Sequence, residues 1–271
     1  MRVLFWCDME GIGGIVKWDQ VMAGSPQYEE GRRLYTAEVN AAVRGAKKAG
    51  ATEIIVVDGH GAGGDHSFNS LIKDQLEPGA EYVFGYRWGC YVEPLTGADA
   101  MLLPGAHAMS GTEDGILSHT MSTENFRSML INGRSVGESG IVAAIAGSFD
   151  VPVVFVSGDE ATCQEVKSLV GPTLHTVAVK KSLSRFAARC LAPADACHLV
   201  EMGVEKALKE RANWPKPLKF TPPVELKVEL AYPDKSNAFK NRVGCEVIDP
   251  MTVIARGENF WQVWDRFWPR T

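Results

Sequence analysis

Carboxylate and imidazole side chains recur in this sequence where hydrophobic runs end. Asp8 and Glu10 follow RVLFWC, His60 follows EIIVVD, His107 follows MLLPGA, and Glu138 opens an apolar, helix-like segment. Three carboxylates and two imidazoles without a thiolate suit Zn²⁺ and, less selectively, Mn²⁺. One carboxylate can bridge two cations about 3.5–4 Å apart, and such a pair generates hydroxide and polarises a carbonyl. The residue types therefore predict a binuclear site for hydrolysis.

The spacing of these residues fits the strands that must position them. Residues i and i+2 of an extended segment point the same way, so Asp8 and Glu10 can share one face. Gly11, Gly13 and Gly14 let the backbone turn close to them without a Cβ clash. In open α/β sheets the carboxyl ends of the strands line the ligand crevice. Acids and histidines from different strands can therefore converge there.

Each of these residues also has an ordinary structural explanation. Asp8 and Glu10 could form a solvated turn, DGHG could be a loop with a surface histidine, and His107 could be a hydrogen-bonded core residue. Glu138 at a helix start is stabilised by the helix dipole. The metal interpretation is favoured because all of the candidates fall at a predicted strand end or helix start. Cys7 would be a soft ligand, but strand alternation points it toward the core.

A further histidine lies in GILSHTM. His119 follows His107 by twelve residues, and an imidazole near a metal site can donate or accept protons. Glu113 and Asp114 could orient His119, although a solvated turn is favoured for both. Asp159 of SGDE could also line the crevice, but a helix N-terminal acid is the favoured role.

The order of the predicted elements indicates an α/β fold. A strand over 2–7, a helix over 28–49 and a strand over 53–57 form a βαβ unit, which requires parallel strands. The Asn132-Gly133 pair predicts a type I′ hairpin turn. The remaining predicted strands are 80–85, 98–108, 151–160 and 173–179, and the remaining helices start at Glu138 and cover 160–169 and about 193–212. We expect a mostly parallel sheet with flanking helices.

The chain changes character near residue 214. WPKPLKFTPP is rich in proline, and Leu226, Val228 and Leu230 then alternate with charged residues, as in a half-exposed antiparallel strand. The aromatic segment ENFWQVWDRFW is predicted to be helical. We therefore place a boundary near 213–216, between a metal-binding α/β domain (1–213) and a smaller α+β region (214–271).

Composition narrows the class of protein. The chain has 271 residues, 45% hydrophobic and 23% charged, with a formal net charge of −5. These values fit a globular protein and argue against a nucleic-acid partner. No apolar run approaches the roughly 20 residues that cross a bilayer, and no secretory signal pattern precedes the first strand. Six cysteines without a C-x-x-C pair indicate a reducing compartment, so we expect a cytoplasmic protein.

Several segments, in order, resemble the zinc-dependent D-aminopeptidase family of the DppA type. They are DMEG, YEEGRRLYTAEVN, VVDGHG, PGAHA, GILSHTM, INGRSVGESG, VPVVFVSGD and VKKSLSRFAARCLAP. The resemblance implies two zinc ions per subunit. Asp8 would bridge the two ions. Glu10 and His60 would complete the coordination of one zinc ion, and His107 and Glu138 that of the other.

The resemblance also implies a role for His119, which matches the histidine proposed as catalytic in the family. On chemical grounds we assign it general acid/base work rather than nucleophilic attack. Ring-shaped homo-oligomers, decamers of two stacked pentamers, are a further implication. At position 6 this chain has Trp6 where the family has serine.

The predicted function is a metallo-aminopeptidase or amidase that releases the N-terminal residue, a D-amino acid by resemblance, from short peptides or amides. One alternative is a binuclear metallophosphoesterase, which normally needs basic groups for phosphate; Lys17 and Arg134 are the nearest to the ligands in sequence. The other is a non-catalytic metal- or ligand-binding protein on the same fold.

Overall fold

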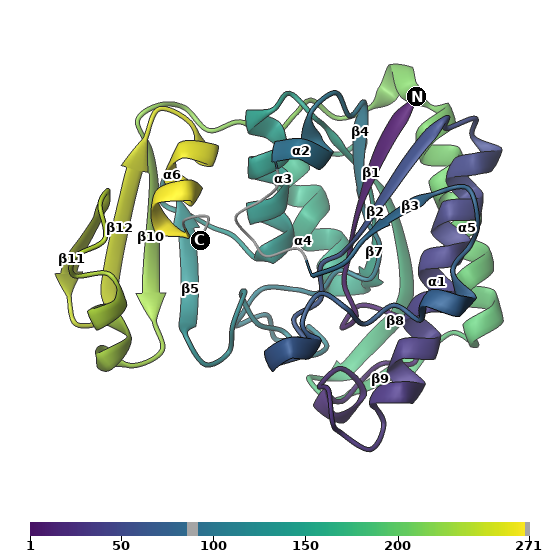
Figure 1. The fold of residues 1–271 in the computed structure, drawn as a ribbon, viewed down its shortest axis with the longest axis horizontal. Helices are drawn as coiled ribbons and strands as arrows, with labels where there is room; N and C mark the ends of the chain where they lie inside the picture. Colours follow the sequence, from purple (N-terminus) through teal and green to yellow (C-terminus); the bar gives the residue numbers. More distant parts are fainter. Residues whose placement is uncertain (86–91, 269–271) are drawn as a thin grey trace.

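The structure, a computed structural model, describes residues 1–85 and 92–268. Within them a central sheet has the strand order β3-β2-β1-β4-β7-β8-β9, and all neighbours are parallel except β8 and β9. This confirms the predicted mostly parallel α/β class (Figure 1). The strands are β1 (Arg2–Cys7), β2 (Glu53–Asp58), β3 (Glu81–Val83), β4 (Ala100–Leu103), β7 (Val153–Asp159), β8 (His175–Ser184) and β9 (Ala187–Cys190).

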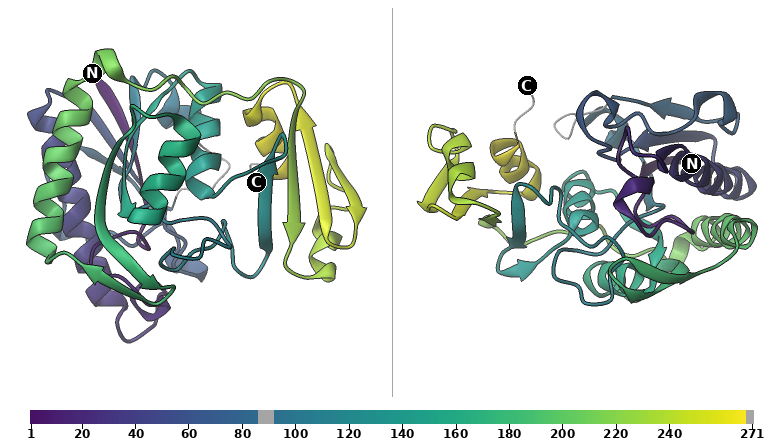
Figure 2. Two further views of the ribbon diagram at one scale, coloured as in Figure 1. Left: turned by 180° about the vertical axis from the view of Figure 1, so that it is seen from behind. Right: turned by 90° about the horizontal axis from the view of Figure 1, so that it is seen from below.

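Helices cover both faces of this sheet (Figures 1 and 2). Alternate side chains of β1 enter two separate cores: Leu4 and Trp6 in one, Phe5 and Cys7 in the other. Such a strand, buried on both faces, is apolar throughout. Helices α1 (Tyr28–Lys48) and α5 (Pro193–Lys209) pack on one face, and α3 (Glu138–Ser148) and α4 (Glu160–Val170) pack on the other; α2 (Val92–Leu95) is a single short turn.

The strand order reverses direction at β1. The chain passes from β1 to β2 and β3 on one side, and then returns to β4 on the other side of β1. The carboxyl ends of β1 and β4 therefore lie at a topological switch point, where open α/β sheets bind ligands. Predicted strand 98–108 is shorter than expected, because Pro104 and Gly105 end β4 and 104–108 continue as loop.

A second, antiparallel sheet has the order β11-β12-β10-β5-β6. Its strands are β5 (Phe126–Ile131), β6 (Arg134–Ser135), β10 (Val224–Leu230), β11 (Cys245–Asp249) and β12 (Thr252–Gly257), and α6 (Phe260–Phe267) packs against it. The predicted hairpin is confirmed, since Asn132 and Gly133 both have the positive φ of a type I′ turn. Because β5 pairs with β10, this sheet combines segments from both sides of residues 213–216.

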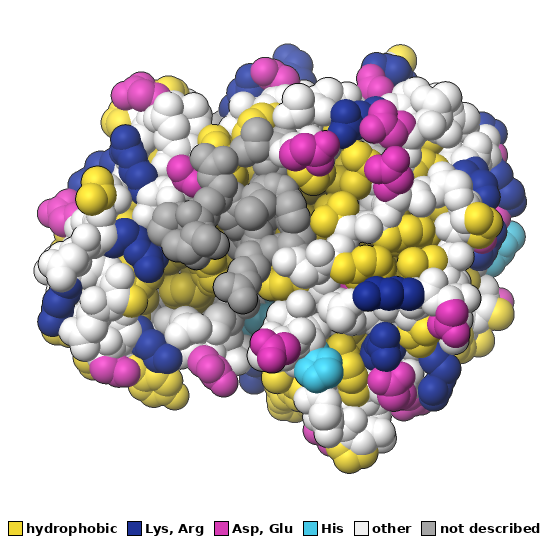
Figure 3. All heavy atoms as spheres, viewed as in Figure 1, with side chains coloured by type: hydrophobic (Ala, Val, Ile, Leu, Met, Phe, Trp, Pro, Cys, Tyr) yellow, Lys and Arg dark blue, Asp and Glu magenta, His cyan; other side chains and the backbone are white. Residues whose placement is uncertain are grey.

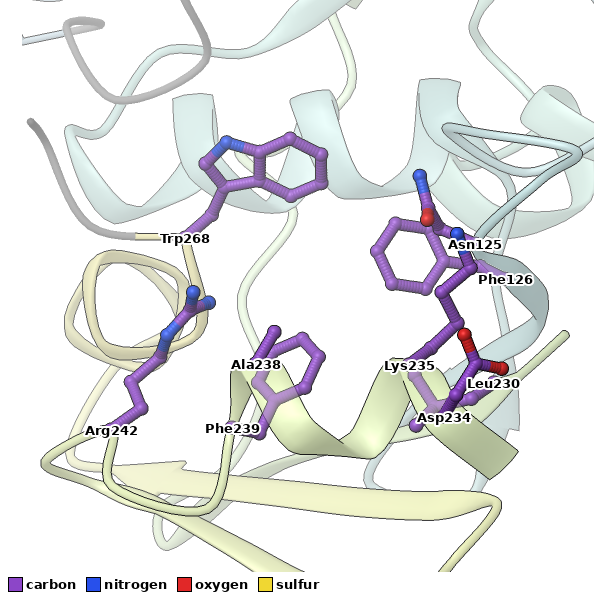
Figure 4. Close-up of a pocket in the computed structure, with 9 residues that line it drawn as sticks. All are labelled: Asn125, Phe126, Leu230, Asp234, Lys235, Ala238, Phe239, Arg242 and Trp268. Carbon is purple, nitrogen blue, oxygen red and sulfur yellow. The ribbon is translucent and has the colours of Figure 1, made fainter. Parts of the chain in front are cut away.

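The alternation predicted for β10 is present, with Leu226, Val228 and Leu230 fully buried. A cavity of about 400 Å³ lies beside this sheet, with Arg242 and Trp268 on one side and Phe126 and Asn125 across from them (Figure 4). None of the predicted metal ligands lines it. It is therefore separate from the switch point.

Acidic and basic side chains are interspersed over the face shown in Figure 3. None of the described helices combines the length and hydropathy needed to span a bilayer. Cys90 lies outside the described residues, and the thiols of the other five cysteines are free.

One hairpin was not predicted. Strand β8 continues to Ser184, beyond the expected 173–179, and pairs with β9. Its turn sequence, Ser184-Arg185-Phe186, lacks the Asn-Gly or Asp-Gly signal of a two-residue hairpin. The local sequence therefore does not predict this hairpin.

Candidate metal centre

The loops that follow β1 and β4 touch each other through their backbones. Asp8 N–H donates to the carbonyl of Pro104 at 3.1 Å, and Gly11 N–H donates to that of Gly105 at 2.8 Å. A Cβ on Gly11 would overlap the carbonyl oxygen of Ala106. Only glycine permits this approach, which brings the side chains after the two strands to one place.

Asp8, Glu10 and His60 form the first cluster of ligand atoms. His60 Nδ1 lies 3.0 Å from Asp8 Oδ1 and 3.1 Å from Glu10 Oε2. Its Nε2 donates to the carbonyl of Val21 at 2.8 Å, because a carbonyl can only accept. In the neutral ring the Nδ1 lone pair therefore faces two carboxylate oxygens, an arrangement that needs a cation or a proton between them.

His107 and Glu138 form a second cluster against the other oxygen of Asp8. His107 Nε2 lies 3.3 Å from Asp8 Oδ2 and 3.6 Å from Glu138 Oε2, and Nδ1 donates to the carbonyl of Ala108 at 3.0 Å. His107 Nε2 and Glu10 Oε2 are buried, and neither has a hydrogen-bond partner among residues 1–85 and 92–268. Buried polar atoms are almost always paired, so these two fit ligands of a cation.

The two oxygens of Asp8 face different histidines, which is the arrangement expected of a bridging carboxylate. A hollow of about 10 Å³, bordered by Asp8, His107, Glu138 and Trp6, lies beside the second cluster. It accommodates about one water molecule. Cys7 belongs to the opposite core, and burial, with the charges of Asp58 and Asp8, raises the pKa of its thiol well above the usual value. The donor set is thus nitrogen and oxygen only.

The pKa shifts of the residues in the two clusters are those expected of a site that binds a cation. Burial opposes ionisation of Asp8, but the hydrogen bond from His60 and the charges of both histidines keep its pKa well below the usual range. Burial lowers the pKa of His107, yet the adjacent Glu138 and Asp8 carboxylates raise it to about 10. The pKa of His60 is raised for similar reasons, against the effect of burial. A bound metal would take the place of those protons.

His119 adjoins the second cluster. Its ring stacks on that of His107 with centroids 4.0 Å apart, and Trp18 meets it edge-on at 5.4 Å. Nδ1 donates to the carbonyl of Leu117 at 2.8 Å, which leaves Nε2 available. Burial and the positive charge of His107 lower the pKa of His119 to about 3, so the ring is neutral. A ligand atom of His119 lies within 4.8 Å of those of His107 and Glu138, so it can move a proton or coordinate a cation.

Other acids at the strand ends support loops. Asp58 Oδ2 accepts the N–H groups of Ser70 and Leu71 at 2.5 and 2.9 Å, which fixes the loop after His60. Asp159 accepts Thr162 N–H at 2.7 Å as the cap of α4, the role favoured from the sequence. Its second oxygen accepts Ile116 N–H at 2.7 Å, just before His119. Glu113 and Asp114 are both exposed.

Sequence reasoning missed Lys180 on β8. Its side chain is 3% exposed, and Nζ donates to the carbonyls of Glu10, Ile12 and Ile15 at 2.6, 2.8 and 2.6 Å. The three ammonium hydrogens thus hold the loop that carries Glu10. Burial lowers the pKa of Lys180 to about 8, against the pull of Asp159 and other acids. The only signal in the sequence was the Lys180-Lys181 pair itself.

Known proteins similar to this chain were found by sequence and by structure. The profile of the D-aminopeptidase family, Peptidase M55, matches residues 1–268. A D-aminopeptidase of Bacillus subtilis (strain 168) is 35% identical over 263 residues, which cover 94% of this chain and 90% of that protein. The solved structure of the Zn-dependent D-aminopeptidase DppA from Bacillus subtilis, a self-compartmentalizing protease, superposes with a TM-score of 0.88 at 31% identity, covering 98% of this chain and 95% of that one.

Proposed function

This chain belongs to the Peptidase M55 family of D-aminopeptidases, and we propose that it removes an N-terminal D-amino acid from short peptides or amides with two zinc ions per subunit. The observation that carries the proposal is the position of Asp8, whose two oxygens face His60 and His107 separately. Glu10 would complete the coordination of the first zinc ion, and Glu138 that of the second. Zinc, when bound, would polarise the scissile carbonyl and lower the pKa of a water molecule.

The protein side chains have separate tasks in this proposal. The Val21 and Ala108 carbonyls fix the two ligand imidazoles in the orientation that presents a lone pair to the metal. His119, which is neutral, would take a proton from the attacking water at Nε2 and deliver it to the leaving amine nitrogen as the C–N bond breaks. The stacked His107 ring and the edge of Trp18 hold the His119 ring in place for both transfers.

A phosphoesterase fits these surroundings less well. Lys180 approaches the site, but all three of its N–H groups are used by backbone carbonyls. Arg134 donates to the carbonyl of Ser168 on the exposed surface. Lys180 therefore has no N–H group left for a transferred phosphoryl group, which such enzymes normally clamp with cations, and Arg134 is directed to the backbone of α4.

The assembly of this protein is also part of the proposal. The DppA relative is a self-compartmentalizing protease, and we expect this chain to form the same kind of closed homo-oligomer, a decamer. Light scattering of the purified protein would measure it. A stable monomer would contradict this part of the proposal alone.

The chemistry is tested with paired L- and D-aminoacyl amides, with and without zinc. We expect zinc-dependent hydrolysis of the D-compounds, and no hydrolysis of p-nitrophenyl phosphate. Asp8→Ala should lose both zinc equivalents, because Asp8 would be a ligand to both. Two equivalents still bound to the Asp8→Ala protein would refute the bridging role.

A further inference from the structure

The turn between β8 and β9 reaches the segment that carries His119. The carbonyl of Arg185 accepts Leu117 N–H at 3.0 Å, and its Nη2 donates to the carbonyl of Ser118 at 3.0 Å. These two bonds place an arginine beside the residue that precedes the proposed proton carrier. Residues 117 and 185 are far apart in sequence, so only the unpredicted hairpin brings them together.

The guanidinium group of Arg185 also lies beside an aromatic ring of the site. Its Cζ is 5.9 Å from the centroid of Trp18, and the same indole meets His119 at 5.4 Å. A single indole therefore contacts both the cation and the imidazole. The guanidinium Cζ also lies 5.2 Å from the centroid of the Phe186 ring. Cation–π contacts of this kind hold a guanidinium in place without consuming its N–H donors.

The positive charge of Arg185 is available to a ligand. None of the ion pairs among residues 1–85 and 92–268 involves Arg185, and its side chain is exposed. Of its five N–H donors, one is used by Ser118. An arginine whose planar fork is oriented but unpaired suits bidentate binding of a carboxylate.

A peptide substrate of the proposed reaction carries such a group. If its N-terminal residue lies at the metal ligands, its C-terminal carboxylate is only one or two residues farther along, at about 3.3–3.6 Å per residue. His119 and the Arg185 guanidinium lie 5.4 and 5.9 Å from the Trp18 ring centroid, so they are no more than about 11 Å apart, the length of about three extended residues. We propose that Arg185 binds the free C-terminal carboxylate of di- and tripeptides, so that the enzyme prefers them to neutral amides. This proposal rests on the aminopeptidase function proposed above.

The test compares two substrates that share one scissile bond. D-alanyl-D-alanine has the free carboxylate, and D-alanyl-D-alaninamide does not. We expect Arg185→Met to lower kcat/KM for the free acid about 10- to 100-fold, mainly through KM, and to change the amide less than about twofold, because one charge-assisted pair is lost. Arg185→Lys should recover part of the loss. Arg189→Met, on exposed strand β9, is the matched control and should change neither substrate.

Three results would overturn the proposal. Equal losses for both substrates would make Arg185 a support of the His119 segment instead. Undiminished cleavage of the free acid by Arg185→Met would exclude a carboxylate contact. If the wild-type holoenzyme cleaves neither compound, the aminopeptidase function fails. The arginine proposal is then decided by calorimetric titration of the same two compounds, where equal affinity of wild type and Arg185→Met for the free acid would reject it.

Discussion

Replacing Lys180 with methionine tests how the loop carrying Glu10 is held. The Lys180 ammonium makes three bonds of 2.6–2.8 Å to the carbonyls of residues 10, 12 and 15. Each bond to a charged group contributes about 1.5–3 kcal/mol, but restoring the lysine to water would recover part of that sum. Breaking a buried charged network by removing one partner typically costs about 3–5 kcal/mol. We expect Lys180→Met to lower the free energy of unfolding by that amount.

The neighbouring lysine is a close control. Lys181 is exposed and pairs with Glu160 at 3.0 Å, and a surface ion pair of this kind contributes about 1 kcal/mol or less. Urea denaturation of the zinc-free wild type, Lys180→Met and Lys181→Met proteins measures the two effects without interference from bound metal. Because the Lys180 side chain fixes the backbone of a proposed ligand, zinc affinity should also fall by about 10- to 100-fold, as it does when outer partners of metal ligands are removed.

Two results would refute this reasoning. If Lys180→Met and Lys181→Met lose the same stability, the three carbonyl contacts do not hold the loop. If Lys180→Met is less stable but binds zinc as tightly as the wild type in a calorimetric competition titration, the loop conformation does not depend on Lys180.

Three further changes test other parts of the site. Glu38 on α1 accepts Gly13 N–H at 3.0 Å, in the loop that follows Glu10. Burial raises the pKa of Glu38 from 4.5 to about 7, so the stability contributed by its neutral carboxyl is full below pH 4.5 and is lost as pH rises through 7. Glu38→Gln should abolish up to about 3 kcal/mol of that loss, and an unchanged difference in urea midpoint between pH 5 and pH 8 would contradict this. The Cβ of Gly11→Ala would overlap the carbonyl of Ala106, so this variant should bind zinc more than tenfold more weakly than the wild type. The control, Gly61→Ala, places a Cβ with nothing within 4 Å and should bind zinc normally. Equal affinities of the two variants would show that the loops after β1 and β4 need not touch. His119→Ala should keep both zinc equivalents and lose at least about 100-fold in turnover, and loss of one equivalent by metal analysis would make His119 a ligand instead.

The proposed ligands could be predicted because their signals are local. A buried strand shows as an apolar run, and an acid or histidine directly after it lies at the carboxyl end of the sheet by construction. Asp8, His60 and His107 all follow strands in this way. Their convergence then depends on the strand order alone, with β1 between β2 and β4. The βαβ pattern implies parallel strands but does not give that order, so the distances within the site could not be predicted.

Lys180 and Arg185 could not be predicted for a different reason. Both lie on the β8–β9 hairpin, and their contacts join positions about 70 to 170 residues apart in sequence. A lysine in a polar, alternating strand is normally solvated. Whether Lys180 faces the loop of Glu10 or the solvent depends on the register of β8 against β7, which shifts between Gly158 and Asp159. That irregularity is a property of the folded sheet and leaves no trace in the β8 sequence.

The Trp6 side chain fills one side of the candidate metal centre. Its ring is 4% exposed and packs so closely on Gly59 that a Cβ there would overlap it, which explains the first glycine of DGHG. The indole also closes the hollow beside Asp8 to about the size of one water molecule, where a serine side chain would leave far more space. The hollow on this side leaves no space for a peptide, and we infer that the substrate approaches from the side of the half-buried His119. Arg185 is bonded to the residue before His119, so a peptide that entered from the His119 side would pass the cation proposed to bind its carboxylate.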